Sequence, residues 1–127
     1  MKVRYTVALS LLAGMAVGAV AIQSLHAEAK PPVYMIALNQ VSNAQGYAKE
    51  YLPPARASIK AHGGVYVAAG PGTVIEGTLP DARVVVLRWD SLEALKAWRN
   101  SPDYMAAREI GMNYAKYNII AVDGVKH

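Results

Sequence analysis

The chain has 127 residues, no cysteine and a formal net charge of +4 at neutral pH. Without cysteine it has no disulfide, no thiol nucleophile and no lipid-modified cysteine. Its basic residues are scattered without a run of like charge, so the sequence predicts neither a nucleic-acid-binding surface nor a charged membrane-binding surface.

The beginning of the chain has the pattern of a secretory signal. Lys2 and Arg4 precede an uncharged apolar run at residues 7–22, and small residues follow near Ala27 and Ala29. A basic start, an apolar middle and a small-residue cleavage site are the three parts of such a signal. The pattern therefore predicts an exported bacterial protein, either periplasmic or secreted.

We expect residues 1–29 to be a cleavable signal peptide and residues 30–127 to form one domain. The sequence is compatible with cleavage either after Ala27 or after Ala29. An uncleaved anchor is the other interpretation, although the apolar run is shorter than the ~20 residues that cross a bilayer. Once the signal is removed, no membrane contact is expected.

The first predicted elements of the domain are a strand and a long helix. Residues 33–40 are apolar on both sides except near their end, and predict a strand. Residues 42–43 offer a helix N-cap, and the glycines at residues 63–64 offer a helix stop. Pro53–Pro54 lies inside this helix. Because proline lacks an N–H and clashes with the carbonyl four residues earlier, we expect a kink or two short helices in series.

A second strand is predicted at residues 65–69, followed by a bend at residues 70–72. Extended structure resumes over residues 73–78, and the turn chemistry of residues 79–82 leads into a third strand at residues 83–90. If residues 79–82 form a four-residue hairpin loop, Thr78 lies opposite the first residue of that third strand.

Two more helices and a last strand complete the order. Asp90 or Ser91 caps a helix, with Asp90 and Glu93 resembling a capping box. Ser101 caps the next helix, and Pro102 occupies its first position, where its missing N–H costs nothing. The last strand is predicted at residues 117–122.

The strand-helix-strand-strand-helix-strand order predicts a ferredoxin-like α+β fold, with one antiparallel sheet and helices on one face. The run from Val84 to Leu87 is apolar at every position, so both faces of the sheet need a cover. Helices of the same chain cover one face. The simplest cover for the other is a second copy, so we expect a homodimer.

Several short motifs occur in one order along the domain: Tyr47-Ala48-Lys49-Glu50-Tyr51, Gly63-Gly64, Glu76-Gly77, Arg83, Trp98 and Ser101-Pro102-Asp103-Tyr104. As a set they resemble the bacterial family known as domain of unknown function 1330, in the dimeric α+β barrel superfamily. The similarity covers about residues 33–125, and the resemblance implies a ferredoxin-like protomer and a homodimer but no established activity. One departure is Asn39-Gln40, where many relatives have an acidic residue.

Aromatic and charged residues suggest a cleft between the helices and the sheet that takes a small apolar or aromatic ligand. The alternative interpretation is that the same aromatic residues serve only ordinary packing in the core and in the dimer interface. We expect no cofactor and no metal site, because the two histidines that remain after the predicted signal, with its His26, is removed do not make a usual ligand set without cysteine. The candidate ligand-binding residues are Tyr47, Tyr51, Glu76, Arg83, Trp98 and Tyr104.

Two smaller constellations have a structural and a functional interpretation. With the four-residue loop, Glu76 and Arg83 are diagonal neighbours, either presenting charge to a ligand or forming an ion pair that fixes the strand register. Ser58 and His62 share a helix face, but no acid that could orient the histidine is evident. His62 is therefore interpreted as a helix C-terminal residue.

Two functions follow from these features. The first is a small-ligand-binding or stress-associated module without chemistry of its own. The alternative is a cofactor-independent enzyme, monooxygenase-like or isomerase-like, acting on a small hydrophobic or aromatic substrate. The enzyme requires the candidate side chains to converge on one cavity.

Overall fold

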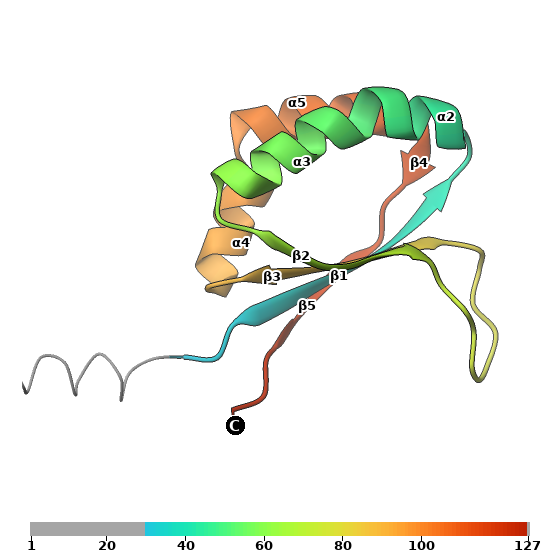
Figure 1. Cartoon of the computed structure of the whole chain (residues 1–127). Helices are drawn as coiled ribbons and strands as arrows, with labels where there is room; N and C mark the ends of the chain where they lie inside the picture. The colour runs from blue at the N-terminus through green and yellow to red at the C-terminus, as the bar shows by residue number, and fades with distance from the viewer. Residues whose placement is uncertain (1–29, 127) are drawn as a thin grey trace, which may run out of the picture. The chain divides into compact units, whose positions relative to one another are not determined.

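The computed structural model describes residues 30–126, so the predicted signal and its cleavage positions lie outside the described residues. The helices and strands of this part agree with the predicted order (Figure 1). They are β1 (Val33–Val41), α2 (Ala44–Gly46), the π-helical turn η1 (Tyr47–Tyr51), α3 (Leu52–Ala61), β2 (Val65–Pro71), β3 (Arg83–Trp89), α4 (Leu92–Arg99), α5 (Pro102–Gly111), β4 (Ala115–Lys116) and β5 (Ile119–Asp123).

One antiparallel sheet forms the base of the domain. Its strand order is β2-β3-β1-β5, and the short β4 pairs with the end of β1. Helices α3 and α5 lie next to each other over one face, as Figure 1 shows. This arrangement confirms the predicted ferredoxin-like α+β fold. None of the helices within residues 30–126 is long and apolar enough to span a membrane.

The two inner strands are apolar on both faces. Val85 and Leu87 are buried beneath the helices, whereas Val84 and Val86 lie on the opposite face and are only half-buried. β1 repeats this pattern, because its buried and half-buried residues alternate along the strand. The opposite face continues onto β5, where Ile120 is 63% exposed. An apolar sheet face without a cover is therefore present in the isolated chain.

The predicted interruption at the prolines takes the form of a π-helical turn. Asn43 caps α2 by accepting a hydrogen bond from the Gly46 N–H. The Leu52 N–H then bonds to the Tyr47 carbonyl, five residues earlier, and Pro53 and Pro54 occupy the first turn of α3. Because proline has no N–H, the prolines leave carbonyls of the preceding turn without their α-helical donors, and the π-helical turn lies directly before them. The turn buries both Tyr47 and Tyr51.

The predicted bend at residues 70–72 and the predicted extended structure over residues 73–78 are wrong, whereas the third strand begins at residue 83 as predicted. β2 continues without a break to Pro71, which pairs with Arg83, and no strand forms over residues 73–78. Residues 72–82 are instead one long loop. Gly77, with φ +86°, adopts a conformation that favours glycine, and this supports a loop rather than a strand. The four-residue hairpin and its register are therefore absent.

The remaining boundaries differ only slightly from the prediction. Ser91, not Asp90, caps α4 through a hydrogen bond from the Ala94 N–H. Ser101 caps α5 as predicted. The last strand is divided into β4 and β5, because the chain leaves the β4 pairing at Tyr117 and resumes pairing at Ile119.

Candidate functional site

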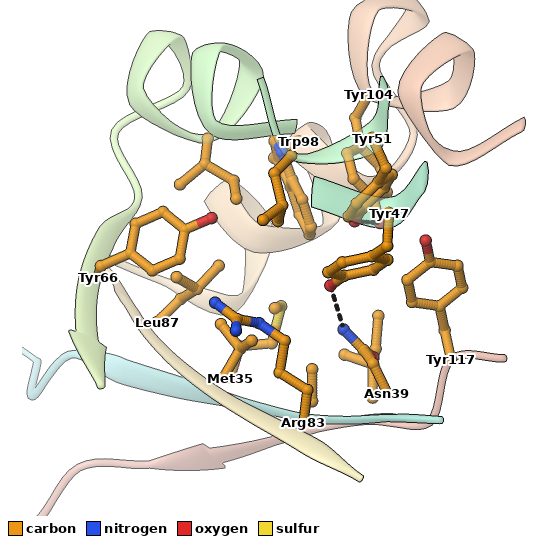
Figure 2. A pocket seen from close by; sticks show the side chains of 15 residues that line it. Met35, Asn39, Tyr47, Tyr51, Tyr66, Arg83, Leu87, Trp98, Tyr104 and Tyr117 are labelled. Atoms are coloured by element: carbon orange, nitrogen blue, oxygen red, sulfur yellow. Dashed lines mark hydrogen bonds between the residues drawn. The ribbon is translucent and has the colours of Figure 1, made fainter. Parts of the chain in front are cut away.

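A small cavity lies between the helical layer and the sheet (Figure 2). Its volume is about 30 Å³, enough for one or two water-sized molecules. Its walls come from every layer of the domain: β1, β3 and β5 below, η1, α3, α4 and α5 above, and β2 at one side. The lining residues are Met35, Ala37, Asn39, Tyr47, Tyr51, Leu52, Ile59, Tyr66, Arg83, Val85, Leu87, Trp98, Tyr104, Tyr117 and Ile119.

A larger groove adjoins the cavity on the surface. Its volume is about 520 Å³, within the range of small-molecule sites. The groove and the cavity share Tyr47, Leu52 and Arg83, which therefore form the boundary between them. The groove is otherwise lined by small and apolar residues of β1, α2 and η1 and by both ends of the loop of residues 72–82. Among the described residues, its two charged ones are Arg83 and Asp81.

Two polar residues face each other at this boundary. Asn39 and Arg83 are directly opposite in the β1–β3 pairing. The Asn39 side-chain amide donates a hydrogen bond of 3.2 Å to the Tyr47 hydroxyl, which Figure 2 shows as a dashed line. The Asn39 carbonyl oxygen Oδ1 and the Arg83 Nε are both buried and have no partner among the described residues. Buried polar atoms are normally bonded, so this pair is unusual.

The wall above the cavity is a set of packed aromatic rings. The hydroxyls of Tyr51 and Tyr104 lie 2.9 Å apart and share a hydrogen bond. The Trp98 ring lies 4.0 Å from that of Tyr104, and its Nε1 donates to the Ser58 hydroxyl at 3.0 Å. These bonds fix the rings in place, so the helical wall is rigid.

Burial keeps the phenol groups of this site neutral. Removal from water raises the pKa of Tyr51, Tyr104 and Tyr117 above the ordinary value for tyrosine. Burial also raises the pKa of Tyr66, although the nearby Arg56 acts in the opposite direction. Near neutral pH these hydroxyls therefore donate and accept hydrogen bonds but are not bases.

No aspartate, glutamate or histidine lines the cavity within the part of the chain that the structure describes. Residues 30–126 contain no group of three or more histidine, cysteine, aspartate or glutamate side chains that could hold a metal ion. A reaction in this cavity would thus receive no proton-abstracting side chain from its walls.

Five of the six candidate residues lie together. Tyr47, Tyr51, Arg83, Trp98 and Tyr104 all line the cavity, whereas Glu76 lies exposed in the loop of residues 72–82. The predicted diagonal pairing of Glu76 with Arg83 is wrong, because Arg83 pairs with Pro71. The ligand-binding role of the other five stays a prediction.

The Ser58–His62 arrangement does not form a nucleophilic pair. The Ser58 hydroxyl donates to the Ala55 carbonyl at 2.8 Å and accepts from Trp98. His62 is the C-terminal cap of α3, and its Nε2 lies 3.1 Å from the Asp103 carboxylate on α5. Each residue therefore has a structural partner.

The model of a protein family, the domain of unknown function DUF1330, matches residues 32–125. The chain belongs to this family. The sequence resemblance is thereby confirmed over almost the whole described part of this DUF1330 domain. No curated protein matches the chain.

Solved structures share the fold of this DUF1330 domain at low sequence identity. A protein of unknown function from Rhodopseudomonas palustris is 16% identical, with a TM-score of 0.65 over 84% of this chain and 93% of that one. SnoaB, a cofactor-independent oxygenase from Streptomyces nogalater, is 10% identical, with a TM-score of 0.58 over 76% of this chain and 96% of its own. A dimeric protein of unknown function from Bacteroides fragilis is 13% identical, with a TM-score of 0.52 over 73% and 96%. Likeness at these identities shows the fold alone.

Several residues of the site were not among the sequence candidates. Asn39 follows three buried positions, Val33, Met35 and Ala37, at the same two-residue spacing. A polar residue in such a series is the signal that could have identified it, because buried polar groups are more informative than exposed apolar ones. Tyr66 and Tyr117 carried no comparable signal, since their placement depends on the bulge in β2 and on the division of the last strand.

Proposed function

We propose that this chain is an exported, homodimeric binding module whose cleft takes a small apolar or aromatic ligand. The observation that carries the proposal is the convergence of rigid aromatic walls on a cavity that adjoins a groove of about 520 Å³. Apolar walls with a few fixed polar groups are typical of small-molecule sites. Within the described residues the inner cavity has no acidic or histidine side chain in its walls, and the groove has one, Asp81.

The homodimer is supported by the uncovered sheet face. Tyr34, Ile36 and Leu38 of β1 lie on the face away from the helices, opposite residues of β3 and β5 in the pairing. A contiguous apolar patch of this kind normally marks an interaction site. A second copy presents the same patch, so a twofold arrangement covers both at once. The dimeric Bacteroides fragilis protein, with the same fold, is consistent with this choice.

Export is supported by the sequence of residues 1–29 alone. Their basic start, apolar middle and small-residue end are the features that the export machinery recognises. We place the domain in the periplasm or outside the cell on this basis. Fractionation of cells that express the complete chain tests the placement, because cytoplasmic protein of unreduced mass would contradict it.

The ligand site is tested by filling the groove. Ala48 is exposed and lines the groove, so Ala48→Trp should occupy part of its volume. Aromatic compounds that raise the melting temperature of the wild type should do so less for this variant, because a ligand of the folded state stabilises it by mass action. Ala106→Trp, at an exposed position of α5, is the matched control. Equal stabilisation of all three proteins would contradict the proposed site.

Cofactor-independent oxygenation is the second candidate. The fold similarity to the oxygenase SnoaB suggests it, and a cavity of about 30 Å³ has room for a molecule as small as dioxygen. Among the described residues Asp81 of the groove is the one candidate base, so a substrate that does not reach it would have to be acidic enough to ionise beside Arg83. Oxygen consumption with acidic phenols, compared between wild type and Ala48→Trp, distinguishes the two functions. Uptake that depends on the groove supports the enzyme, and no uptake supports the binding module.

A further inference from the structure

Arg83 is a cation that forms no ion pair among residues 30–126, and the Asp81 carboxylate of the same groove is not within ion-pair distance of it. No carboxylate lies within ion-pair distance of its guanidinium group among residues 30–126, and its Nε is buried without a partner. Figure 2 shows the guanidinium group pointing into the cavity beside Leu87 and Met35. A partly buried charge beside apolar groups costs free energy unless an anion pairs with it. Arg83 is therefore prepared for an anionic group.

Asn39 provides an unused acceptor next to this cation. It is 4% exposed, and its amide N–H is already bonded to Tyr47, but its Oδ1 has no partner. Residues directly opposite in an antiparallel pair have Cβ atoms about 4.5–5.5 Å apart. Asn39 Oδ1 and the Arg83 guanidinium group can therefore contact one ligand together. The ligand would need an acidic oxygen and, close to it, a hydrogen-bond donor.

The position of this pair fixes where the rest of the ligand lies. The inner cavity, at about 30 Å³, is too small for an aromatic body, whereas the groove of about 520 Å³ is large enough. The groove contributes apolar contacts from Val41, Ala48 and Leu52. A ligand would thus place its polar head at Arg83 and its apolar body in the groove.

We infer that the ligand of this cleft is an apolar or aromatic acid bearing a hydroxyl group, with its acid bound by Arg83 and its hydroxyl by Asn39. The inference rests on the proposed binding function and specifies its ligand class. Arginine suits this role because its planar guanidinium group presents fixed N–H donors to a carboxylate. A neutral compound of the same shape would leave the cation unpaired.

The test compares three probes of similar size by calorimetric titration of the purified protein: benzoate, its neutral isostere benzamide, and 3-hydroxybenzoate. We expect benzoate to bind at least about tenfold more tightly than benzamide, as charge-assisted hydrogen bonds require. We expect 3-hydroxybenzoate to bind a further several-fold more tightly, because its hydroxyl satisfies Asn39. Equal affinities of benzoate and benzamide would overturn the inference.

Arg83 variants identify the cation responsible. Arg83→Gln should abolish the preference for benzoate over benzamide, and Arg83→Lys should retain part of it, because lysine keeps the charge but not the planar donors. Arg56→Gln removes an equal charge near the cleft from an exposed residue that does not line the cavity, and it should retain the preference. An unchanged preference in Arg83→Gln would contradict the inference. If Arg83→Gln does not fold, Arg83→Lys is compared with Arg56→Gln. The preference for benzoate should be smaller in Arg83→Lys than in Arg56→Gln, and equal preferences would contradict the inference.

The two proposals fail in different ways. If benzamide and benzoate bind equally and Ala48→Trp weakens both, the cleft is a ligand site and only the acid class is wrong. If no probe binds at millimolar concentration, or if binding is insensitive to Ala48→Trp, both the binding function and the acid class are contradicted.

Discussion

The hydroxyl groups of Tyr51 and Tyr104 lie 2.9 Å apart inside the core and share one hydrogen bond. Tyr51 belongs to the π-helical turn and Tyr104 to α5, so the bond joins the two helical segments above the cleft. Both side chains are buried, at 6% and 1% exposure. Each hydroxyl therefore depends on the other for its partner.

Removing both of these hydroxyls should cost less than the sum of the costs of removing each one alone. Tyr51→Phe leaves the Tyr104 hydroxyl buried and unpaired, and we expect the free energy of unfolding to fall by about 1–3 kcal/mol. The double variant Tyr51→Phe/Tyr104→Phe leaves no unpaired group. Its loss should be smaller than the sum of the two single losses, as measured by denaturant unfolding. Additive losses would show that the bond contributes nothing specific.

Gly111 is required by close packing at the end of α5. A Cβ atom at this position would overlap the Tyr117 hydroxyl and the Tyr51 ring. Gly111→Ala should therefore lower the free energy of unfolding by about 1–3 kcal/mol, as overpacking does. Adding Tyr117→Phe removes one of the two overlaps and should restore part of the loss. If Tyr117→Phe restores none of the lost stability, the overlap with the Tyr117 hydroxyl is not the cause of the loss.

The dimer interface is predicted to be the uncovered sheet face. Ile120→Glu introduces a charge on this face, and the apparent dissociation constant of the dimer should rise on the order of tenfold or more. Met105→Glu, at a comparably exposed apolar residue of α5, should leave the dimer unchanged. Sedimentation equilibrium measures both. A wild-type protein that is monomeric at micromolar concentration would contradict the interface.

Stability should fall in acid partly through Asp103. The Ser101 hydroxyl, and after it His62, holds the pKa of the Asp103 carboxyl below the ordinary value for aspartate. Because the folded state prefers the ionised form, this contribution is present above about pH 4 and is lost as the pH falls through the folded pKa. Asp103→Asn should lose less free energy of unfolding between about pH 6 and pH 3 than the wild type. Equal losses would contradict this role, and Glu109→Gln on the same helix is the control.

The fold and the two-sided sheet were predictable because they depend on local patterns. Apolar residues at every position from Val84 to Leu87 and a serine cap before Pro102 indicate their elements without long-range information. The loop of residues 72–82 was not predictable in this way. Residues 73–78 have apolar β-branched members, but the strand register is set by the pairing of Pro71 with Arg83. A hairpin register is a tertiary property.

The site was predictable in part for the same reason. Tyr47 and Tyr51 share a helix face, so their convergence followed from the sequence. The pairing of Asn39 with Arg83 joins positions far apart in the chain, and it required the β1–β3 register. Glu76 was misplaced by the register error, which moved it from the loop to the sheet.

The location of the ligand is tested most directly by nuclear magnetic resonance. Titration of isotope-labelled protein with 3-hydroxybenzoate should shift the signals of the Arg83 Nε–H and the Asn39 side-chain amide, both at the boundary of cavity and groove. The backbone signal of Glu76 should not change. Saturable shifts confined to other residues, with Arg83 and Asn39 unaffected, would contradict the assignment of this cleft as the binding site.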